Sequence, residues 1–542
     1  MKLGLLVTEK YVDTQTHKQT RFMFYKYRYI FTKCVSLHSL STSPQYTQVT
    51  IHLLMQACEF FGAWSLLMAA FIRFTPDYYC EVDNSMTSSS TGSVDTLNVC
   101  SVNGTECSSY NFTGPLSTAV TEWDLVCHLD NIPQIMLSLQ MGGTAVGGLL
   151  AGQISDTYGR KISFYFFQLF LIASNGFSAA SDSWVMFAVF RFMIGVGRGF
   201  LLTSLGSYSV EFLTVRWRSV SSVRPAFGVG LMFFSLAGYL LKDVMDLHIL
   251  TAALSVLPLY FVWFYVPESA RWLIVQGDTQ AATKVLQRVA SINGKDMPKD
   301  VDAVMENMMR FETRCGRGGN RYSFIDLFRT RYMAKISISL WLCTFAVSLA
   351  VYGISFGVSS LSGNLYLNIF LLGLFALPTS ASFYFNDRFG RKISTVAFVA
   401  LCAVFSLGCL LGMIFSSEER GGMAVTIMSI IAYLFAYCAQ RCTEVWIVEL
   451  YPTVIRAMGF GWAMSGSRVA GIVAPFVINL EARPQISFII LTAALAGSIA
   501  LYFFLPETNR TVLYNSIGDQ GVKKLAEQKN QMVPVECRED AE

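Results

Sequence analysis

The run Gly152-Gln153-Ile154-Ser155-Asp156-Thr157-Tyr158-Gly159-Arg160-Lys161 lies between two long apolar stretches, where charge is costly. A shortened copy follows at Asn386–Lys392, and 231 residues separate Asp156 from Asp387. A single basic turn fits the general excess of Lys and Arg in cytoplasmic loops. The repeat instead indicates two homologous halves.

Composition places the chain in the membrane. Its 542 residues are 53% hydrophobic and 14% charged, whereas soluble proteins carry about a quarter charged residues. The net charge of +4 is too small to argue for a nucleic-acid partner, and no nucleic-acid motif appears. The five His residues include no pair at metal-ligand spacing, so we expect no metal site and no His-based catalysis.

Two kinds of signal share one polar segment. Cys80, Cys100, Cys107 and Cys127 form an even set that predicts two disulfides in an oxidising compartment, with three connectivities open. The same segment holds two glycosylation sequons, which begin at Asn103 and Asn111.

A helix needs about 20 apolar residues to cross a bilayer, and twelve stretches qualify. They are residues 51–74, 132–154, 162–180, 184–204, 225–241, 249–266, 336–356, 365–385, 393–415, 423–448, 457–478 and 486–505. The sequence therefore predicts an all-α membrane protein with twelve transmembrane helices in two halves of six. The expected parts are a segment 1–50, a first half 51–266 with a loop 75–131, a linker 267–335, a second half 336–505 and a tail 506–542.

Lys and Arg gather in connections on one side, which predicts that both termini and the linker are cytoplasmic and that the Cys loop faces outside. In the linker, Asp278 or Thr279 can cap an amphipathic helix that ends at Asn293-Gly294. The segment before residue 50 is basic and aromatic but has no signal-peptide layout.

The halves match beyond the charged turn. Glu211 and Arg218 after the fourth span correspond to Glu449 and Arg456 after the tenth, and Pro267-Glu268 corresponds to Pro506-Glu507. Parallel repeats of this kind place a substrate path at their interface.

Four strings in order then resemble one family. They are Thr75-Pro76-Asp77, Glu122-Trp123-Asp124-Leu125-Val126-Cys127, Pro267-Glu268-Ser269-Ala270-Arg271-Trp272-Leu273 and Glu449-Leu450-Tyr451-Pro452-Thr453-Val454-Ile455-Arg456. Together with the charged turns they resemble the organic cation, anion and zwitterion (carnitine-type) transporters of the major facilitator superfamily, over roughly residues 50 to 510. The resemblance implies that superfamily's fold, a plasma-membrane location and a small organic ion as substrate.

The charged turns are interpreted as a conformational latch. Gly152 is expected to permit close helix approach, and Asp156 to face a helix terminus in the other half. Arg160 and Lys161 can meet Glu211 or Glu268, and Arg391 and Lys392 can meet Glu449 or Glu507. The set that we assign to the latch comprises Gly152, Asp156, Gly159, Arg160, Lys161, Glu211, Arg218, Glu268, Asp387, Gly390, Arg391, Lys392, Glu449 and Arg456. The alternative is that these residues only determine topology.

Ionisable residues inside spans are candidates for substrate recognition. Arg468, midway along the eleventh span, can hold a carboxylate; in the family that it resembles, anion and zwitterion carriers typically have Arg at this place. Arg441 and Glu444 either neutralise each other or hold both ends of a zwitterion. Tyr352 resembles an aromatic cavity residue of the family, and Trp341, Trp446 and Trp462 can line the same space.

Two further points bear on the substrate. Glu59 in the first span can pair with Arg191 or Arg198 in the fourth. The stretch Leu377-Pro378-Thr379-Ser380 lacks the Lys that organic anion carriers of the family often have nearby, which keeps a zwitterion such as carnitine open beside an anion.

The expected function is polyspecific transport of organic ions by alternating access. An organic cation carrier and a sugar carrier of the same superfamily are the alternatives. A membrane enzyme is not expected, since no nucleophile, His pair or acidic cluster lies at membrane depth, and we expect no cofactor. The lack of a Gly-x4-Gly-Lys-Ser/Thr loop disfavours direct ATP drive. The coupling ion, Na⁺ or H⁺, and the oligomeric state stay open.

Overall fold

Eleven of the twelve predicted spans each coincide with one helix in the computed structural model, and the eighth coincides with two helices. The structure describes residues 46–81, 97–102, 105–107, 109–212, 225–294, 324–415, 422–452, 455–478 and 484–509. The spanning helices of the first group are α2 (Tyr46–Arg73), α4 (Ile132–Tyr158), α5 (Arg160–Ala179), α6 (Trp184–Phe212), α7 (Pro225–Leu241) and α8 (Val244–Tyr265). Those of the second are α12 (Arg331–Phe356), α13 (Leu365–Ala376) with α14 (Ser382–Phe389), α15 (Arg391–Phe415), α16 (Gly422–Leu450), α17 (Arg456–Ile478) and α18 (Pro484–Phe504).

Eleven of the described helical segments are long and apolar enough to cross a membrane, and α7, with 17 residues, is a shorter apolar helix. The eighth predicted span is interrupted. Leu377-Pro378 turns the chain into the 3-10 helix η5 (Leu377–Ala381) between α13 and α14, because Pro lacks the N–H that an α-helix needs. The first helix begins at Tyr46, five residues before the predicted start.

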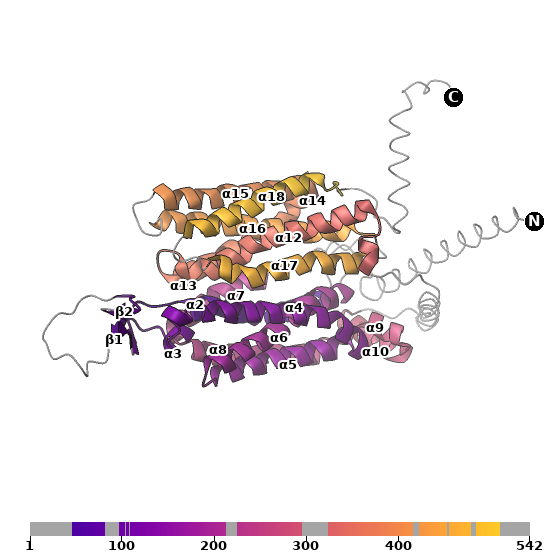
Figure 1. Cartoon of the computed structure of the whole chain (residues 1–542). Helices are drawn as coiled ribbons and strands as arrows, with labels where there is room; N and C mark the ends of the chain where they lie inside the picture. The colour runs from indigo at the N-terminus through magenta and orange to yellow at the C-terminus, as the bar shows by residue number, and fades with distance from the viewer. Residues whose placement is uncertain are drawn as a thin grey trace, which may run out of the picture. The chain divides into compact units, whose positions relative to one another are not determined.

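By packing, the chain divides into two compact units. Unit 1 comprises residues 1–320 with 358–360 and 364–377, and unit 2 comprises 321–357 with 361–363 and 378–542. Helix α13 therefore groups with unit 1, where its Gly373 lies against Gly228 of α7 so closely that a Cβ on Gly373 would come within 2.6 Å of the Gly228 carbonyl. The predicted second half had included this helix. Figure 1 shows the long helices of each unit lying alongside one another.

The tightest packing in unit 1 joins α4 to α6. A Cβ on Gly147 would collide with the carbonyl of Val196, and one on Gly199 would collide with that of Thr144. Small residues allow backbones to approach in lipid, where helices gain little from burial of apolar surface. This contact fixes the position of α6, which carries Arg191 and Arg198.

Short elements complete the fold. Two small antiparallel sheets, β1 (Tyr78–Glu81) with β4 (Ser109–Phe112) and β2 (Ser101–Val102) with β3 (Thr105–Glu106), precede α3 (Ala119–Glu122) and the 3-10 helix η1 (Cys127–Leu129). Helices α9 (Ala270–Gln276) and α10 (Thr279–Ile292) follow α8. Asp278 caps α10 through the backbone N–H of Ala281, as predicted. The 3-10 helices η3 (Phe324–Leu327) and η4 (Gly357–Ser360) flank α12.

Candidate functional site

The charged turn of unit 1 is built around Gly159 and the start of α5. Gly159 has φ +100°, a conformation that favours glycine, and a Cβ there would come within 2.6 Å of Glu268 Oε2. The space is used by the Glu268 carboxylate, which accepts hydrogen bonds from the backbone N–H groups of Arg160 (3.0 Å) and Lys161 (3.1 Å). Glu268 thus binds the helix N-terminus, where the dipole favours an anion.

Arg160 connects this turn to α4 and α6. Its Nη2 lies 2.6 Å from Asp156 Oδ1, and its Nε lies 3.3 Å from Glu211 Oε1. The contact with Glu211 is electrostatic, without the alignment of a hydrogen bond. Lys161 meets Glu268, one of the two partners expected for it, through its backbone N–H. Its side-chain Nζ donates to the Trp263 carbonyl at 2.6 Å.

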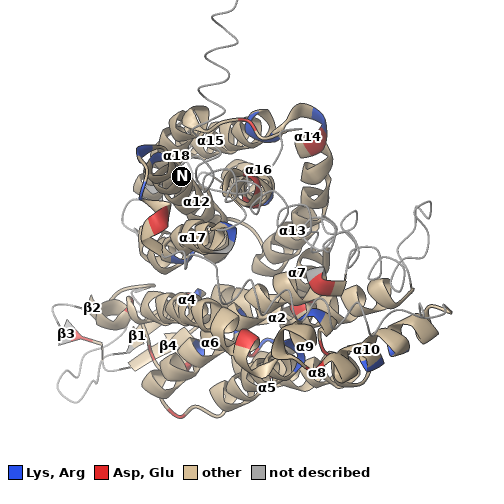
Figure 2. Ribbon diagram, turned by 90° about the vertical axis from the view of Figure 1, so that its right-hand side faces the viewer, with Lys and Arg blue, Asp and Glu red and all other residues tan. Residues whose placement is uncertain are grey.

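The copy in unit 2 has the same plan. Gly390 has φ +96°, and Glu507 accepts from the backbone N–H groups of Arg391 and Lys392, each at 2.9 Å. Lys392 Nζ donates to the Phe503 carbonyl at 2.7 Å. Figure 2 shows red and blue segments gathered at the helix ends that hold these turns.

The two turns differ in how well their carboxylates are satisfied. Arg391 forms two hydrogen bonds with Glu449, of 2.9 and 2.8 Å, and its Nη1 lies 3.0 Å from Asp387. Thr508 Oγ1 also donates to Glu449 at 2.6 Å. In unit 1, by contrast, Glu211 Oε2 is buried and has no hydrogen-bond partner among the described residues.

The pKa values of the two capping glutamates shift in opposite directions. Burial raises the pKa of Glu268 more than the N–H groups of Ser269, Lys161 and Arg160 lower it, and nearby Glu211 raises it further. At Glu507 burial is again the largest single cause and raises the pKa. Four backbone N–H groups, of Asn509, Lys392, Arg391 and Thr508, together outweigh it and lower the pKa. Unit 1 therefore holds its carboxylate less firmly in the charged form.

Three residues of the predicted latch stand apart. Gly152 is not a point of close approach, because a Cβ there would meet nothing within 4 Å. The close contacts of α4 lie nearer its start, at Gly143 and Gly147. Arg456 Nε donates to the Tyr451 carbonyl at 3.3 Å. Arg218 lies outside the described residues.

In unit 2 the predicted substrate residues come from α12, α16 and α17. Arg441 Nη1 donates to Glu444 Oε2 at 2.8 Å, and the Arg441 guanidinium lies 4.9 Å from the Tyr437 ring centre. Arg441 and Glu444 therefore neutralise each other, which is one of the two interpretations that the sequence allowed.

Arg468 lies beside a tyrosine. Its Nη1 lies 3.5 Å from the hydroxyl of Tyr352, so the structure brings these two predicted residues together. Arg468 forms no ion pair with any residue that the structure describes. Tyr433 lies close enough to both Arg441 and Tyr352 to interact with each electrostatically. It therefore connects the Arg441–Glu444 pair with the Arg468–Tyr352 contact.

The tryptophans fall into two classes. Trp341 and Trp462 lie 6.1 Å apart between ring centres. Trp341 donates a hydrogen bond to the Ser465 hydroxyl, and Trp462 donates one to the Ser337 carbonyl. Trp446 is 0% exposed and stacks on Tyr502. The expectation that Trp446 lines a cavity is therefore wrong, because its ring is enclosed in the core.

Sequence reasoning missed a small polar pocket in unit 2. It is lined by Thr344, Val347, Ser348, Gln440, Thr443, Glu444, Met464 and Ser467. The Oε1 of Gln440 and the hydroxyl of Ser467 are buried there, and the described part of the chain provides neither with a hydrogen-bond partner. Uncharged polar residues inside apolar helices give no sequence signal that separates such a pocket from ordinary packing.

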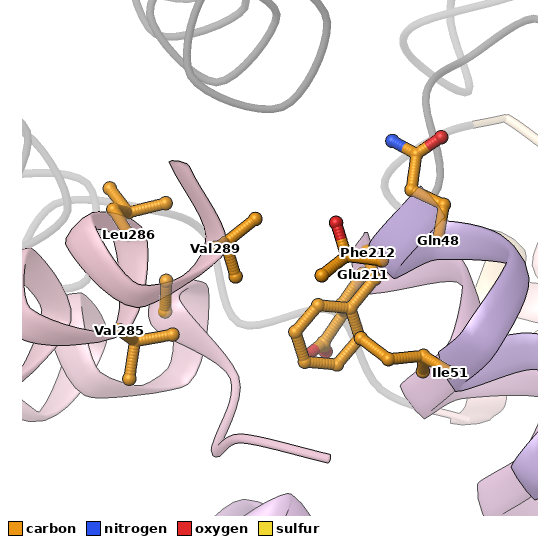
Figure 3. Close-up of a pocket in the computed structure, with 9 residues that line it drawn as sticks. Gln48, Ile51, Glu211, Phe212, Val285, Leu286 and Val289 are labelled. Atoms are coloured by element: carbon orange, nitrogen blue, oxygen red, sulfur yellow. The ribbon is translucent and has the colours of Figure 1, made fainter. Parts of the chain in front are cut away.

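A second pocket, in unit 1, lies beside the charged turn. Figure 3 shows Val285, Leu286 and Val289 of α10 facing Ile51 and Phe212 across a gap. Asn293, just after α10, accepts from the backbone N–H of Thr47 at 3.3 Å and so holds α10 to the start of α2. The pocket is mainly apolar, and it follows from the amphipathic face of α10.

Unit 1 also contains a buried ion pair. Arg198 donates to Glu59 from Nη1 at 2.7 Å and from Nη2 at 2.8 Å. The sequence left Arg191 and Arg198 open as partners of Glu59, and in the structure the partner is Arg198.

The four predicted disulfide cysteines pair as Cys80–Cys107 and Cys100–Cys127, which settles the connectivity that the sequence left open. Asn111 is an exposed residue of β4. Asn103 lies outside the described residues.

Comparison with known proteins adds a family to this geometry. Residues 54–516 match the family described as "Sugar (and other) transporter". The chain is 32% identical over 408 residues to organic anion transporter 3 of Sus scrofa, covering 74% of this chain and 73% of that protein. It is 32% identical over 430 residues to solute carrier family 22 member 6-A of Xenopus laevis, covering 77% and 74%.

Solved structures agree on the fold. The inward-open xylose transporter XylE from E. coli matches with a TM-score of 0.60 at 15% identity, covering 86% of this chain and 98% of that one. The proton:xylose symporter XylE bound to 6-bromo-6-deoxy-D-glucose matches with a TM-score of 0.58 at 15% identity, covering 86% and 97%.

Proposed function

The chain belongs to the organic ion transporters of the major facilitator superfamily, and we propose that it carries organic anions across the membrane by alternating access. The relatives named for organic anions support the substrate class. The observation that carries the proposal is the charge of Arg468 beside Tyr352, for which the described residues provide no ion pair. A guanidinium in a low-dielectric setting attracts a carboxylate and repels a cation.

The structure favours an anion over a zwitterion. A zwitterion such as carnitine needs a free acidic group for its cationic end, yet Glu444 is already paired with Arg441. An organic cation carrier would leave Arg468 facing a like charge. A sugar carrier would leave it without a partner.

Uptake by expressing cells tests this proposal. Labelled dicarboxylate, carnitine and a quaternary ammonium dye are compared, each normalised to the amount of protein at the cell surface. We expect dicarboxylate to be taken up best. Arg468→Gln should reduce that uptake by about tenfold or more, because it removes one charge-assisted hydrogen bond to the substrate. Tyr352→Phe, which removes only the hydroxyl, should have a smaller effect. Preference for the quaternary ammonium dye, or unchanged uptake by Arg468→Gln, would overturn the proposal.

We further propose that the charged turns form a latch for one state of the transport cycle. The capping of α5 by Glu268 and of α15 by Glu507 supports a shared mechanical role. Asp156 is the test residue, because its carboxylate is largely exposed and pairs with Arg160 within its own turn. Asp156→Asn should lower turnover at normal surface expression, and unchanged turnover would contradict the latch.

The proposed topology is multi-pass in the plasma membrane, with both termini cytoplasmic and the disulfide-bonded segment outside. The exposed Asn111 supports glycosylation of that segment. Asn111→Gln should increase mobility on a denaturing gel, and epitope tags at either terminus should stain only after permeabilisation. Coupling to Na⁺, to H⁺ or to exchange is tested by imposing each gradient separately on vesicles that contain the purified protein.

A further inference from the structure

Arg191 lies in the interior of unit 1 with its positive charge uncompensated. Its side chain is 0% exposed, and the part of the chain that the structure describes offers it no ion pair. Its Nη2 donates to Oε1 of Gln140, while Nε and Nη1 have no acceptor. Arg198, seven residues along the same helix, has Glu59 as a partner. The two arginines of α6 therefore differ in this one respect.

Polar groups from four other helices surround Arg191. Gln140 of α4 donates from Nε2 to the Ser65 carbonyl of α2 at 3.0 Å, which orients its Oε1 toward Arg191. Asn175 of α5 donates to Ser65 Oγ at 3.2 Å. His248 of α8 is also 0% exposed and close enough to Arg191 to interact electrostatically. This cluster is named the Arg191 site.

The hydrogen bonds within the site determine which ring nitrogen of His248 carries the proton. Asn175 Nδ2 already donates to Ser65 and to the Leu171 carbonyl, so its Oδ1 is an acceptor. His248 Nδ1 lies 3.2 Å from that oxygen and therefore donates to it. The second ring nitrogen, Nε2, has no partner in the structure. Nε2 of this neutral tautomer can only accept, so the unused donors of the site are Nε and Nη1 of Arg191.

Aromatic rings separate the site from the polar segment that precedes α4. Phe187 packs edge-on against His248 with 5.6 Å between ring centres, and Trp123 packs against Phe187 at 5.1 Å. Both Arg191 and His248 are fully enclosed, so an organic anion is too large for the site. A ligand there must be a single ion or a group of very few atoms.

We propose that the Arg191 site binds a small inorganic anion of the halide class. A buried guanidinium without a counter-charge is very unfavourable, and a halide removes that cost by accepting hydrogen bonds from Nε or Nη1. The site belongs to unit 1 alone, whereas Arg468 belongs to unit 2. Halide binding at Arg191 therefore stands or falls independently of the proposed role of Arg468.

Thermal unfolding of the purified full-length protein in detergent tests the site. Chloride or bromide replaces gluconate at constant sodium concentration. A ligand that binds only the folded state raises the unfolding temperature with concentration, and we expect this for the wild type. Arg191→Lys keeps the charge and should need about tenfold more halide for the same rise, because a lysine presents a different donor geometry. Arg191→Gln should show no rise. Arg329→Gln, which changes a largely exposed arginine outside both anion sites, is the control and should respond as the wild type does.

A direct measurement makes the test independent of how stable the variants are. Wild-type crystals grown in bromide should show an anomalous peak in contact with the Arg191 guanidinium. The absence of that peak, or a wild-type unfolding temperature that halide does not change, would overturn the proposal. An equal halide response in wild type and Arg191→Gln would do so as well, since the anion would then bind elsewhere.

Discussion

The carboxylate of Glu59 and the guanidinium of Arg198 meet at two points, at 2.7 and 2.8 Å, and each side chain is 1% exposed. The pair joins α2 to α6 in the interior of unit 1. Gly62, one turn along α2, makes room for it, because a Cβ at that position would collide with Arg198 Nη1. A buried pair of this kind is held by geometry, since neither charge can turn to water.

Removal of one partner should be more harmful than removal of both. Glu59→Gln leaves Arg198 buried and uncompensated, and we expect a loss of about 3–5 kcal/mol of unfolding free energy. The double variant Glu59→Leu with Arg198→Met should recover most of that loss. Thermal unfolding of the purified proteins measures both. Arg329→Gln, which removes a side chain that is 73% exposed from its pair with Asp326, is the control and should change little. A Glu59→Gln protein as stable as the control would show that the pair is dispensable.

The two capping glutamates should respond to pH with opposite sign. The pKa of Glu268 is raised in the folded state, so its contribution to stability grows as pH falls through that raised value. The pKa of Glu507 is lowered, so its contribution is present above the usual range of a carboxyl group and is lost as pH falls through the lowered value. At neutral pH we therefore expect Glu507→Gln to destabilise the protein more than Glu268→Gln.

Unfolding temperatures of the two variants, followed from about pH 7 to pH 4, provide the measurement. The gap between them should narrow on acidification. Equal effects at every pH would mean that the four N–H groups around Glu507 do not distinguish it from Glu268.

The contact between α4 and α6 predicts a sharp difference between two glycines of one helix. Gly147→Ala places a methyl group against the Val196 carbonyl and should cost about 1–3 kcal/mol or more, as overpacking does. Gly152→Ala meets open space and should be neutral or slightly stabilising, because alanine favours a helix. Surface abundance and thermal unfolding compare the two. Similar losses in both variants would argue against the backbone contact.

The disulfide connectivity is testable by mass spectrometry. Peptides from the unreduced protein should link Cys80 to Cys107 and Cys100 to Cys127. Cys80→Ser and Cys107→Ser should each destabilise by about 2–4 kcal/mol, and the double variant should be no worse than either single one. Additive losses, or a Cys80–Cys100 peptide, would contradict this pairing.

Much of the fold could be predicted because it depends on composition along the chain. All twelve spans and the cap at Asp278 follow from apolar length and from local capping chemistry. The interruption at Leu377-Pro378 was missed, since a proline inside an apolar run does not show whether the helix bends or ends. The grouping of α13 with α7 was also missed, because it depends on a contact between Gly228 and Gly373, far apart in sequence.

The site was predicted in part for a similar reason. The sequence identified Glu268 and Glu507 and paired Lys161 with Glu268. It did not show that each glutamate caps a helix through backbone N–H groups, or that the Lys161 side chain donates to the Trp263 carbonyl. It named Arg191 and Arg198 without deciding which one would meet Glu59. Arg191 and Arg198 lie about two turns apart on nearly the same face of α6. The choice between them therefore depends on how far α6 is shifted along α2, which the sequence pattern does not give.

The two disulfides overlap between residues 100 and 107, and this has a consequence for proteolysis. A single backbone cut anywhere from residue 80 to residue 127 falls inside at least one of the two covalent loops. The halves of a nicked chain therefore remain joined, and α2 stays tied to α4. A protease must cut twice, or a reductant must act first, before this segment can be released.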